Sequence, residues 1–447
     1  MPTSIPSCAR CRAGSKWIRS AAQFDGFLVG RLMKITILTY GSRGDVQPFL
    51  ALAVGLQKRG HAVRLAAPHR FADFVAGRNV PFAPLAGDPE EISKAFVAAG
   101  NNAIKMARSI RDYVNSIAVD VARGAFAACD DAELIVHSFL FTTGAHSLAC
   151  QRGIPDISIQ TFPIFAPTRE YPPAALSSLP KGWLSYLGHW LNTQIFWYGG
   201  NSGYHRRRNQ QPDIFSFDLF WPFDEKPPRR ATPLLFAVSP TVLPPAREWA
   251  DRVHVTGYFF LDSPADYQPP VELTRFLDAG SAPICVTFGS MIHRDADRVA
   301  DTVIESIRRS GQRAIVLTGW DGWKGRVSSD DFLFLESAPH DWLFPRCEFV
   351  VHHGGAGTTA AGLRAGIPNI VIPFAGDQLF WGKRVHAVGA GPRPISVGGL
   401  TMTRLSSALV EAEGDALRHR ARLIGQKIGC EDGVGEAIRV VESRLVA

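Results

Sequence analysis

Short apolar runs alternate with amphipathic segments along this chain, and the first three elements set the pattern. Residues 34–40 (KITILTY) are typical of a buried strand, a helix is expected from Asp45 to about Arg59, and residues 61–66 (HAVRLA) resemble a second strand. Gly60 ends the helix, as glycine commonly does. This order predicts the βαβ unit of a parallel sheet, with the ligand groups at the carboxyl ends of the strands.

The same alternation continues through the rest of the chain. Further strands are expected at residues 133–138, 156–160, 234–239, 283–288, 314–318, 332–336 and 349–351. The turns that follow the last four of these strands would meet at one sheet edge, where open α/β sheets bind ligands. The pattern therefore predicts an α/β protein with two Rossmann-like domains and a nucleotide-type ligand in the second one.

The length of 447 residues also favours two domains. Residues 1–32 have no clear periodicity, so we expect an extension that is disordered or not native. A first domain is then predicted over residues 33–240, a proline-rich linker over 241–255 and a second domain over 256–447. We expect the last helix of the chain to pack back on the first domain.

The composition narrows the classes of function. The formal net charge is +7, but residues 1–32 hold five basic residues against one acid, and the remainder carries 43 basic and 40 acidic residues. This near balance does not indicate nucleic-acid binding. The seven scattered cysteines suit a reducing cytoplasm, and the sequence has no apolar run approaching the ~20 residues that a membrane-spanning helix needs.

Candidate chemistry is concentrated in residues 350–384 (VVHHGGAGTTAAGLRAGIPNIVIPFAGDQLFWGKR). A strand here leads through a glycine-rich turn into a helix, an arrangement whose free backbone N–H groups and helix dipole favour an anion such as phosphate. One βα unit later, Asp377 and Gln378 follow a second strand. The run therefore predicts a phosphate site beside polar groups that could hold a sugar.

This run resembles the donor-binding signature of the UDP-glycosyltransferase superfamily, and within it the sterol glucosyltransferases and the bacterial natural-product glycosyltransferases. The segments MKITILTYGSRGDVQP and VHVTGYFFL carry the same resemblance. It implies the GT-B fold, in which two Rossmann-like domains face each other across a cleft. The implied activity is inverting, metal-independent transfer of a hexose, glucose by preference, from a UDP-sugar to a hydroxyl of a lipophilic acceptor.

The resemblance also implies roles for individual residues. Asp45 would be the catalytic base, because the sterol-type members have an aspartate where the plant enzymes have a histidine. His137, at a strand end of the same domain, is the candidate partner of Asp45 or a structural histidine. The candidate donor-binding residues are Ser290, Trp320, His340, Trp342, His353, Gly355, Ala356, Gly357, Thr358, Asp377 and Gln378.

Two departures from the plant pattern affect the nucleotide. Ser337 stands where a tryptophan stacks on uracil, and Ala361 stands where a glutamate holds the ribose. Trp320, His340 and Trp342 are the candidates for holding the base and ribose instead. A dTDP-sugar donor, as for a natural-product glycosyltransferase, is therefore the alternative to a UDP-sugar.

No metal or other cofactor is expected. Asp295 and Asp297 match the DxD pattern of metal-dependent glycosyltransferases, but they lie at a predicted helix N-terminus, where acids are favoured by the helix dipole alone. The phosphate site at the second-domain helix would supply the charge stabilisation instead.

The acceptor is indicated by an aromatic segment, residues 183–198, with apolar residues at helical spacing. It is either a core helix or an apolar wall for a lipophilic acceptor that also touches a membrane. Phe162, Trp183, Trp190 and Trp197 are the candidate acceptor-binding residues.

Two other functions keep the same fold. A non-catalytic nucleotide- or glycolipid-binding relative would release no UDP when an acceptor is added. A nucleotide-sugar 2-epimerase would need no acceptor, and the aromatic segment argues against it.

Overall fold

The structure is a computed structural model, and it describes residues 32–89, 91, 103–205, 232–249, 252–289, 295–319, 321–323 and 325–444. Within these ranges the side chains of residues 103–111, 114, 115, 143, 197–205 and 321 are not described. Three sequence predictions therefore lie outside the described part: the extension over residues 1–31, the donor contacts Ser290 and Trp320, and the side chain of Trp197.

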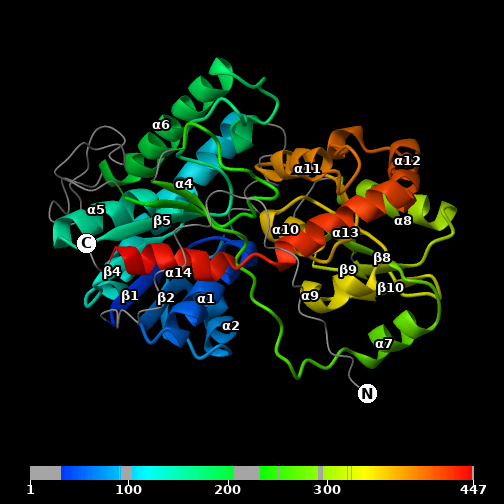
Figure 1. Cartoon of the computed structure of the whole chain (residues 1–447), viewed down its shortest axis with the longest axis horizontal. Helices are drawn as coiled ribbons and strands as arrows, with labels where there is room; N and C mark the ends of the chain where they lie inside the picture. Colours follow the sequence, from blue (N-terminus) through cyan, green and yellow to red (C-terminus); the bar gives the residue numbers. More distant parts are fainter. Residues whose placement is uncertain are drawn as a thin grey trace, which may run out of the picture.

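Two parallel sheets organise the described residues (Figure 1). The first has the strand order β3-β2-β1-β4-β5-β6-β7 and the second β10-β9-β8-β11-β12. The strands are β1 Lys34–Leu38, β2 Ala62–Pro68, β3 Phe82–Leu85, β4 Leu134–His137, β5 Asp156–Gln160, β6 Leu234–Phe236, β7 Val253–Val255, β8 Ile284–Thr287, β9 Ala314–Leu317, β10 Phe332–Leu335, β11 Val350–His352 and β12 Asn369–Val371.

Helices connect and cover these strands. They are α1 Arg43–Lys58, α2 Ala72–Ala76, α4 Ala103–Ala128, α5 Thr142–Arg152, α6 Trp183–His205, α7 Val271–Asp278, α8 Ala296–Arg309, α9 His340–Leu343, α10 Ala356–Arg364, α11 Gln378–Ala387, α12 Met402–Glu413, α13 Asp415–Gly429 and α14 Gly433–Ser443. Every strand pair is parallel, so the carboxyl ends of the strands of each sheet share one edge. The two-sheet α/β architecture predicted from the alternation is confirmed.

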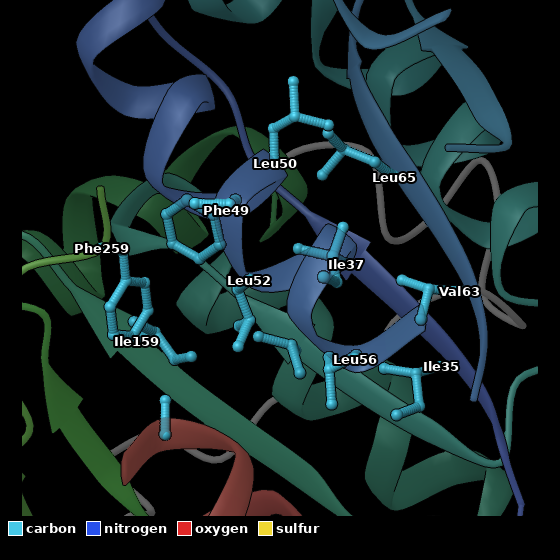
Figure 2. Close-up of a cluster of buried hydrophobic side chains, with 14 of the residues drawn as sticks. Ile35, Ile37, Phe49, Leu50, Leu52, Leu56, Val63, Leu65, Ile159 and Phe259 are labelled. Atoms are coloured by element: carbon cyan, nitrogen blue, oxygen red, sulfur yellow. The ribbon is translucent and has the colours of Figure 1, made fainter. Parts of the chain in front are cut away.

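The apolar alternation of the first strands packs a different helix layer on each face of the first sheet. On one face, Ile35 and Ile37 of β1 contact a core formed with Phe49, Leu52 and Leu56 of α1 (Figure 2). On the other face, Leu38 joins a separate cluster built with α4 and α5. Because strand side chains alternate between faces, neighbouring residues of one strand enter different cores.

The end of the first sheet differs from the sequence prediction. Residues 253–255 are predicted as part of the linker, and the segment 253–261 as the entry into the second domain. Instead, Val253 and Val255 lie in β7, which pairs with β6 in the register Leu234↔Val253. The pairing covers the backbone groups of β6 that would otherwise remain open at the edge of the sheet.

The last helix, α14, lies on the first sheet rather than the second (Figure 1). Its residues Ile438 and Val441 are buried in the same core as α1. The chain returns at a close crossing, where a Cβ added to Gly433 would lie 2.5 Å from the carbonyl carbon of Gly257. Glycines are therefore needed for the two crossing segments to approach this closely.

Candidate active site

The N-terminus of α10 offers uncapped backbone donors at the carboxyl edge of the second sheet. Strand β11 ends at His352, and α10 begins at Ala356 after the Gly354–Gly355 turn. The N-cap residue Gly355 makes no side-chain cap, and the first intrahelical bond there runs from Thr359 N to Gly355 O at 2.9 Å. The preceding N–H groups, of Ala356, Gly357 and Thr358, are available to an anion.

The two adjacent histidines have different environments. His352 is buried: its Nδ1 accepts from Gly354 N at 3.1 Å, so its Nε2 carries the proton and donates to Asn369 Oδ1 at 3.1 Å. Burial, the neighbouring His353 and the nearby His340 lower its pKa to about 3, despite the bond to Asn369. His352 therefore holds the turn in shape.

His353 lies beside two glycine turns, the one that follows β8 and the one that precedes α10. A Cβ added to Gly289, after β8, or to Gly355 would lie 3.2 Å from the imidazole Cε1 of His353, so both turns approach the ring. Burial lowers the pKa of His353 to about 4, so the ring is neutral at pH 7. A neutral imidazole can donate one hydrogen bond to a phosphate oxygen without carrying charge.

The candidate base Asp45 is the third residue of α1 and is held by the turn before the helix. Its Oδ2 accepts from Ser42 N at 2.7 Å and from Ser42 Oγ at 2.9 Å. This is also how a first-turn carboxylate stabilises a helix, so the contact by itself indicates no catalysis. Burial raises the pKa of Asp45, while the bonds from Ser42 oppose the rise. A raised pKa makes a carboxylate a better base.

Asp377 and Gln378 lie at the start of α11, where Asp377 is the N-cap residue and Gln378 the first residue of the helix. Asp377 Oδ2 accepts from Trp381 Nε1 at 2.8 Å, and Gln378 Oε1 accepts from the N–H groups of Phe374 and Ala375 at 2.7 and 3.1 Å. The oxygen of Gln378 therefore shapes the loop that presents Asp377. Trp381 is fully buried, which fixes the bonded oxygen of Asp377.

The carboxylates of Asp45 and Asp377 come from different domains and interact electrostatically. Burial raises the pKa of Asp377 to about 6, and the negative charge of Asp45 contributes to the rise, against the bond from Trp381. Asp45 comes from the first sheet and Asp377 from the second, so only the packed domains bring their charges within range of each other. Sequence spacing places them 332 positions apart.

Arg43 is a further candidate residue, next but one to Asp45, that the sequence predictions did not include. Its Nε donates to Gln47 Oε1 at 3.2 Å, and its guanidinium carbon lies 4.7 Å from the ring centroid of Phe74. Burial, followed by the positive charge of Arg43 and then the electrostatic coupling to His353, lowers the pKa of His340 to about 4. Arg43 therefore lies within electrostatic range of His340, which belongs to the opposite domain. Its place in the same turn as Asp45 is the signal that could have identified it.

The base-holding candidates have partners already. The His340 ring stacks on Phe344 at 4.4 Å between centroids, and Trp342 lies beneath the guanidinium of Arg346 at 4.0 Å and edge-on to Tyr267 at 5.8 Å. Of His340 and Trp342, His340 is the candidate that interacts electrostatically with Arg43 and His353.

His137 is directed elsewhere. It is fully buried, and its Nε2 lies 2.9 Å from Asp156 Oδ2. Val136, the preceding residue, faces the α1 core, so strand alternation turns His137 to the α5 face of the sheet. Asp45 lies in the first turn of α1, which covers the opposite face of the sheet. The hydrogen bond to Asp156 therefore favours the structural alternative for His137.

The amino-terminal and carboxyl-terminal parts of the chain match two family models. Residues 35–166 match the glycosyltransferase family 28 N-terminal domain, and residues 330–428 match the C-terminal domain of erythromycin biosynthesis protein CIII-like proteins. Sterol 3-beta-glucosyltransferase UGT80B1 of Arabidopsis thaliana is 34% identical over 92% of this chain and 68% of its own length. The chain belongs to the glycosyltransferase family that includes the sterol 3-beta-glucosyltransferases.

Other relatives in this glycosyltransferase family are longer than the chain. UGT80A2 of Arabidopsis thaliana is 34% identical over 92% of this chain and 66% of its own length. The sterol 3-beta-glucosyltransferase of Candida albicans is 35% identical, and the match spans 92% of this chain but 28% of that protein. The chain thus covers between about a quarter and two thirds of these relatives.

Solved structures show the same fold. The glycotransferase of kitacinnamycin has a TM-score of 0.68 at 19% identity, covering 93% of this chain and 99% of that one. The calicheamicin glycosyltransferase CalG4 has a TM-score of 0.67 at 18% identity, covering 93% and 98%. The predicted GT-B arrangement and the family resemblance are both confirmed.

The acceptor candidates of this family member divide into two groups. Phe162, which follows β5, packs against Phe139 at 5.4 Å, and Phe139 in turn contacts Phe196 of α6 at 4.7 Å. Trp183 and Trp190 of α6 instead point outward, with 66% and 50% of their surface exposed. The structure therefore brings Phe162 together with α6 but leaves these two tryptophans on an outer face.

Two further observations concern cofactors and membranes. Among the residues the structure describes, no group of three or more histidine, cysteine, aspartate or glutamate side chains comes together as a metal site. Asp295 is the N-cap residue of α8 and Asp297 lies in its first turn. Over the same part of the chain, no helix is both long and apolar enough to cross a bilayer.

Proposed function

We propose that this chain transfers a hexose, glucose by preference, from a UDP-sugar to a hydroxyl group of a lipophilic acceptor such as a sterol. The observation that carries the proposal is the uncapped N-terminus of α10, which lies beside His353 at the carboxyl edge of the second sheet. Asp45 of the first domain is near enough for its negative charge to contribute to the raised pKa of Asp377. Relatives named as sterol 3-beta-glucosyltransferases support glucose and sterol.

In the proposed mechanism the acceptor hydroxyl gives its proton to Asp45 as its oxygen attacks the anomeric carbon of the sugar. The bond from that carbon to the diphosphate oxygen breaks, and UDP leaves with the bonding electrons. Attack from the first domain and departure toward the second invert the configuration at this carbon. The N–H groups of Ala356, Gly357 and Thr358 and the neutral His353 would stabilise the charge that develops on the diphosphate.

Asp377 would accept hydrogen bonds from the hexose hydroxyls through its Oδ1, since Trp381 bonds to its Oδ2. Arg43 would add positive charge beside the diphosphate from the opposite domain, since the pKa values of His340 and His353, both lowered to about 4, leave those rings neutral. We place the donor in the second domain and the acceptor in the first. Ser290 and Trp320 remain proposed donor contacts.

The test is a direct assay of the purified full chain. UDP-glucose and dTDP-glucose are each supplied with a panel of sterols and polyketides, and both nucleotide release and glycosylated product are measured. We expect UDP release that depends on the acceptor, together with a product heavier by one hexose. Product from dTDP-glucose alone would favour the natural-product alternative, which a neighbour solved with thymidine diphosphate supports. Binding of either nucleotide without any product would favour a non-catalytic relative.

The outward face of α6 supports peripheral contact with a membrane, where a sterol acceptor would be found. Eight large apolar residues of this helix are exposed: Trp183, Leu184, Tyr186, Leu187, Trp190, Leu191, Ile195 and Phe196. An interfacial helix buries such a face at the boundary between headgroups and acyl chains. Our proposed acceptor contacts are Phe162, Trp183, Trp190 and Trp197. The free thiols of the described cysteines suit a membrane contact on the cytoplasmic side.

Vesicle flotation tests this contact. The double variant Trp183→Ser with Ile195→Ser removes two exposed apolar side chains and should weaken vesicle binding by at least ~10-fold, because burying each would contribute ~1.5–3 kcal/mol. Val410→Ser, at an exposed valine of α12, is the matched control. Equal flotation of both variants would exclude α6 as the contact.

A further inference from the structure

A second group of polar side chains lies outside the transfer site, between α5 and the first sheet. Its centre is the carboxylate of Asp156 at the start of β5. Asp156 Oδ2 lies 2.9 Å from His137 Nε2 and 3.0 Å from His146 Nδ1, and Asp156 Oδ1 accepts from Thr232 Oγ1 at 3.1 Å. Three donors from three parts of the chain therefore fix this buried carboxylate.

The group continues from Asp156 to the surface through one helix. His146 and Cys150 lie four residues apart on α5, and the second ring nitrogen of His146, Nε2, is 3.6 Å from Cys150 Sγ. The side chain of Cys150 is exposed. A thiol, an imidazole and a carboxylate thus stand in line, and the order is that in which a base activates a nucleophile and a carboxylate orients the base.

The contacts within this group hold His146 and Asp156 in their charged forms. Burial alone would lower the pKa of His146, but its hydrogen bonds to Asp156 and Cys150 outweigh that effect and raise the pKa to about 10. Burial would likewise raise the pKa of Asp156, yet the bonds from His137 and His146 hold it well below its ordinary value. An imidazolium backed by a carboxylate consequently lies 3.6 Å from the sulfur of Cys150, in the arrangement that supports a nucleophile.

We propose that Cys150 is a nucleophilic thiol, activated by His146 and Asp156, and a site of covalent modification by hydroperoxides and other soft electrophiles. With a hydroperoxide, the thiolate sulfur attacks one peroxide oxygen and the O–O bond breaks. The departing oxygen takes the proton from His146 Nε2 and leaves as an alcohol or water, while the sulfur is oxidised to a sulfenic acid. The proposal does not depend on sugar transfer.

Cys430 provides an internal reference for the test. It is the other exposed cysteine among the described residues, and it follows α13 without a hydrogen bond to a histidine in that part of the chain. The full chain is treated with iodoacetamide at pH 7, and alkylation of each cysteine is followed by peptide mass spectrometry. Each rate is divided by the rate of the same cysteine in the guanidinium-unfolded chain, which corrects for local sequence.

We expect Cys150 to react ~10-fold faster in the native chain than in the unfolded one, because the His146–Asp156 pair stands beside its sulfur only in the folded chain and this arrangement activates a nucleophile. Cys430 should show a ratio of one or less. His146→Gln should bring Cys150 to the ratio of Cys430, and a dimedone adduct should form at Cys150 after hydrogen peroxide treatment.

A native Cys150 rate no greater than its unfolded rate would overturn the proposal, and this comparison needs no variant. A fast rate that persists in a folded His146→Gln chain would overturn the assignment of His146 as the activating base. Loss of sugar transfer in an assay of the unmodified chain would contradict only the proposed function.

Discussion

Replacing Gly41 by alanine should disable the proposed base without touching it. Gly41 lies at the carboxyl end of β1 with φ +138°, and a Cβ built there would be 2.6 Å from Cγ of Asp45 and closer still to its Oδ2. Real Cβ atoms do not approach so closely, so the carboxylate must move away from Ser42. The glycine is needed both for its backbone conformation and for the space it leaves.

The size of the effect follows from these two consequences. A left-handed backbone costs an L-residue ~1–2 kcal/mol, which should lower the free energy of unfolding by about that amount. Misplacing a catalytic group by about 1 Å can cost ~100-fold in rate, and a general base contributes ~10²–10⁴-fold in total. We therefore expect the Gly41→Ala rate constant kcat to fall ~100-fold or more. UDP affinity should change little, since α10 belongs to the other domain.

The assay measures acceptor-dependent UDP release, UDP binding by calorimetry and thermal unfolding for each variant. Gly311→Ala is the matched control, because Gly311 also has positive φ, +69°, but no atom lies within 4 Å of its Cβ position. This control should lose similar stability and keep full transfer. A folded Gly41→Ala chain that transfers at the rate of the unaltered chain would refute the role of the Asp45 carboxylate as base.

Three further predictions test other parts of the site. The pKa of Asp377 is raised to about 6, so its carboxylate becomes protonated as the pH falls through 6. We therefore expect kcat/KM to drop below pH 6, while UDP binding measured by calorimetry does not. An Asp377→Asn chain that shows the same fall of kcat/KM at acid pH would contradict this. Arg43→Gln should lower kcat at least ~10-fold and weaken the salt dependence of UDP binding, because hydrogen bonds to charged groups contribute ~1.5–3 kcal/mol. Unchanged kinetics would exclude Arg43 from the diphosphate site. Gly357→Ala should raise the melting temperature slightly, since alanine is favoured over glycine by ~1 kcal/mol in a helix. The same change should weaken UDP binding, because the methyl group would enter the open space before α10. Tighter UDP binding would contradict the anion site.

Local patterns in the sequence determined the elements and the kind of ligand site. Apolar alternation placed β1, α1 and β2 close to their observed bounds, since packing against a sheet requires that periodicity. The glycine turn before Ala356 indicated an anion site, because few residues other than glycine allow a backbone to approach a ligand so closely. These features depend on residues near one another in the chain.

Tertiary structure alone decided which of these residues meet. Strand β7 joins the first sheet by hydrogen bonds to β6. This strand has only three residues, and so short a sequence cannot specify which strand it pairs with. The partner of His137 was likewise settled by Asp156 of the neighbouring strand, whose carboxylate also contacts His146 of α5. Asp45 and Asp377 come within electrostatic range of each other only because the two domains pack, as do Arg43 and His340, and sequence separation does not encode these distances in space.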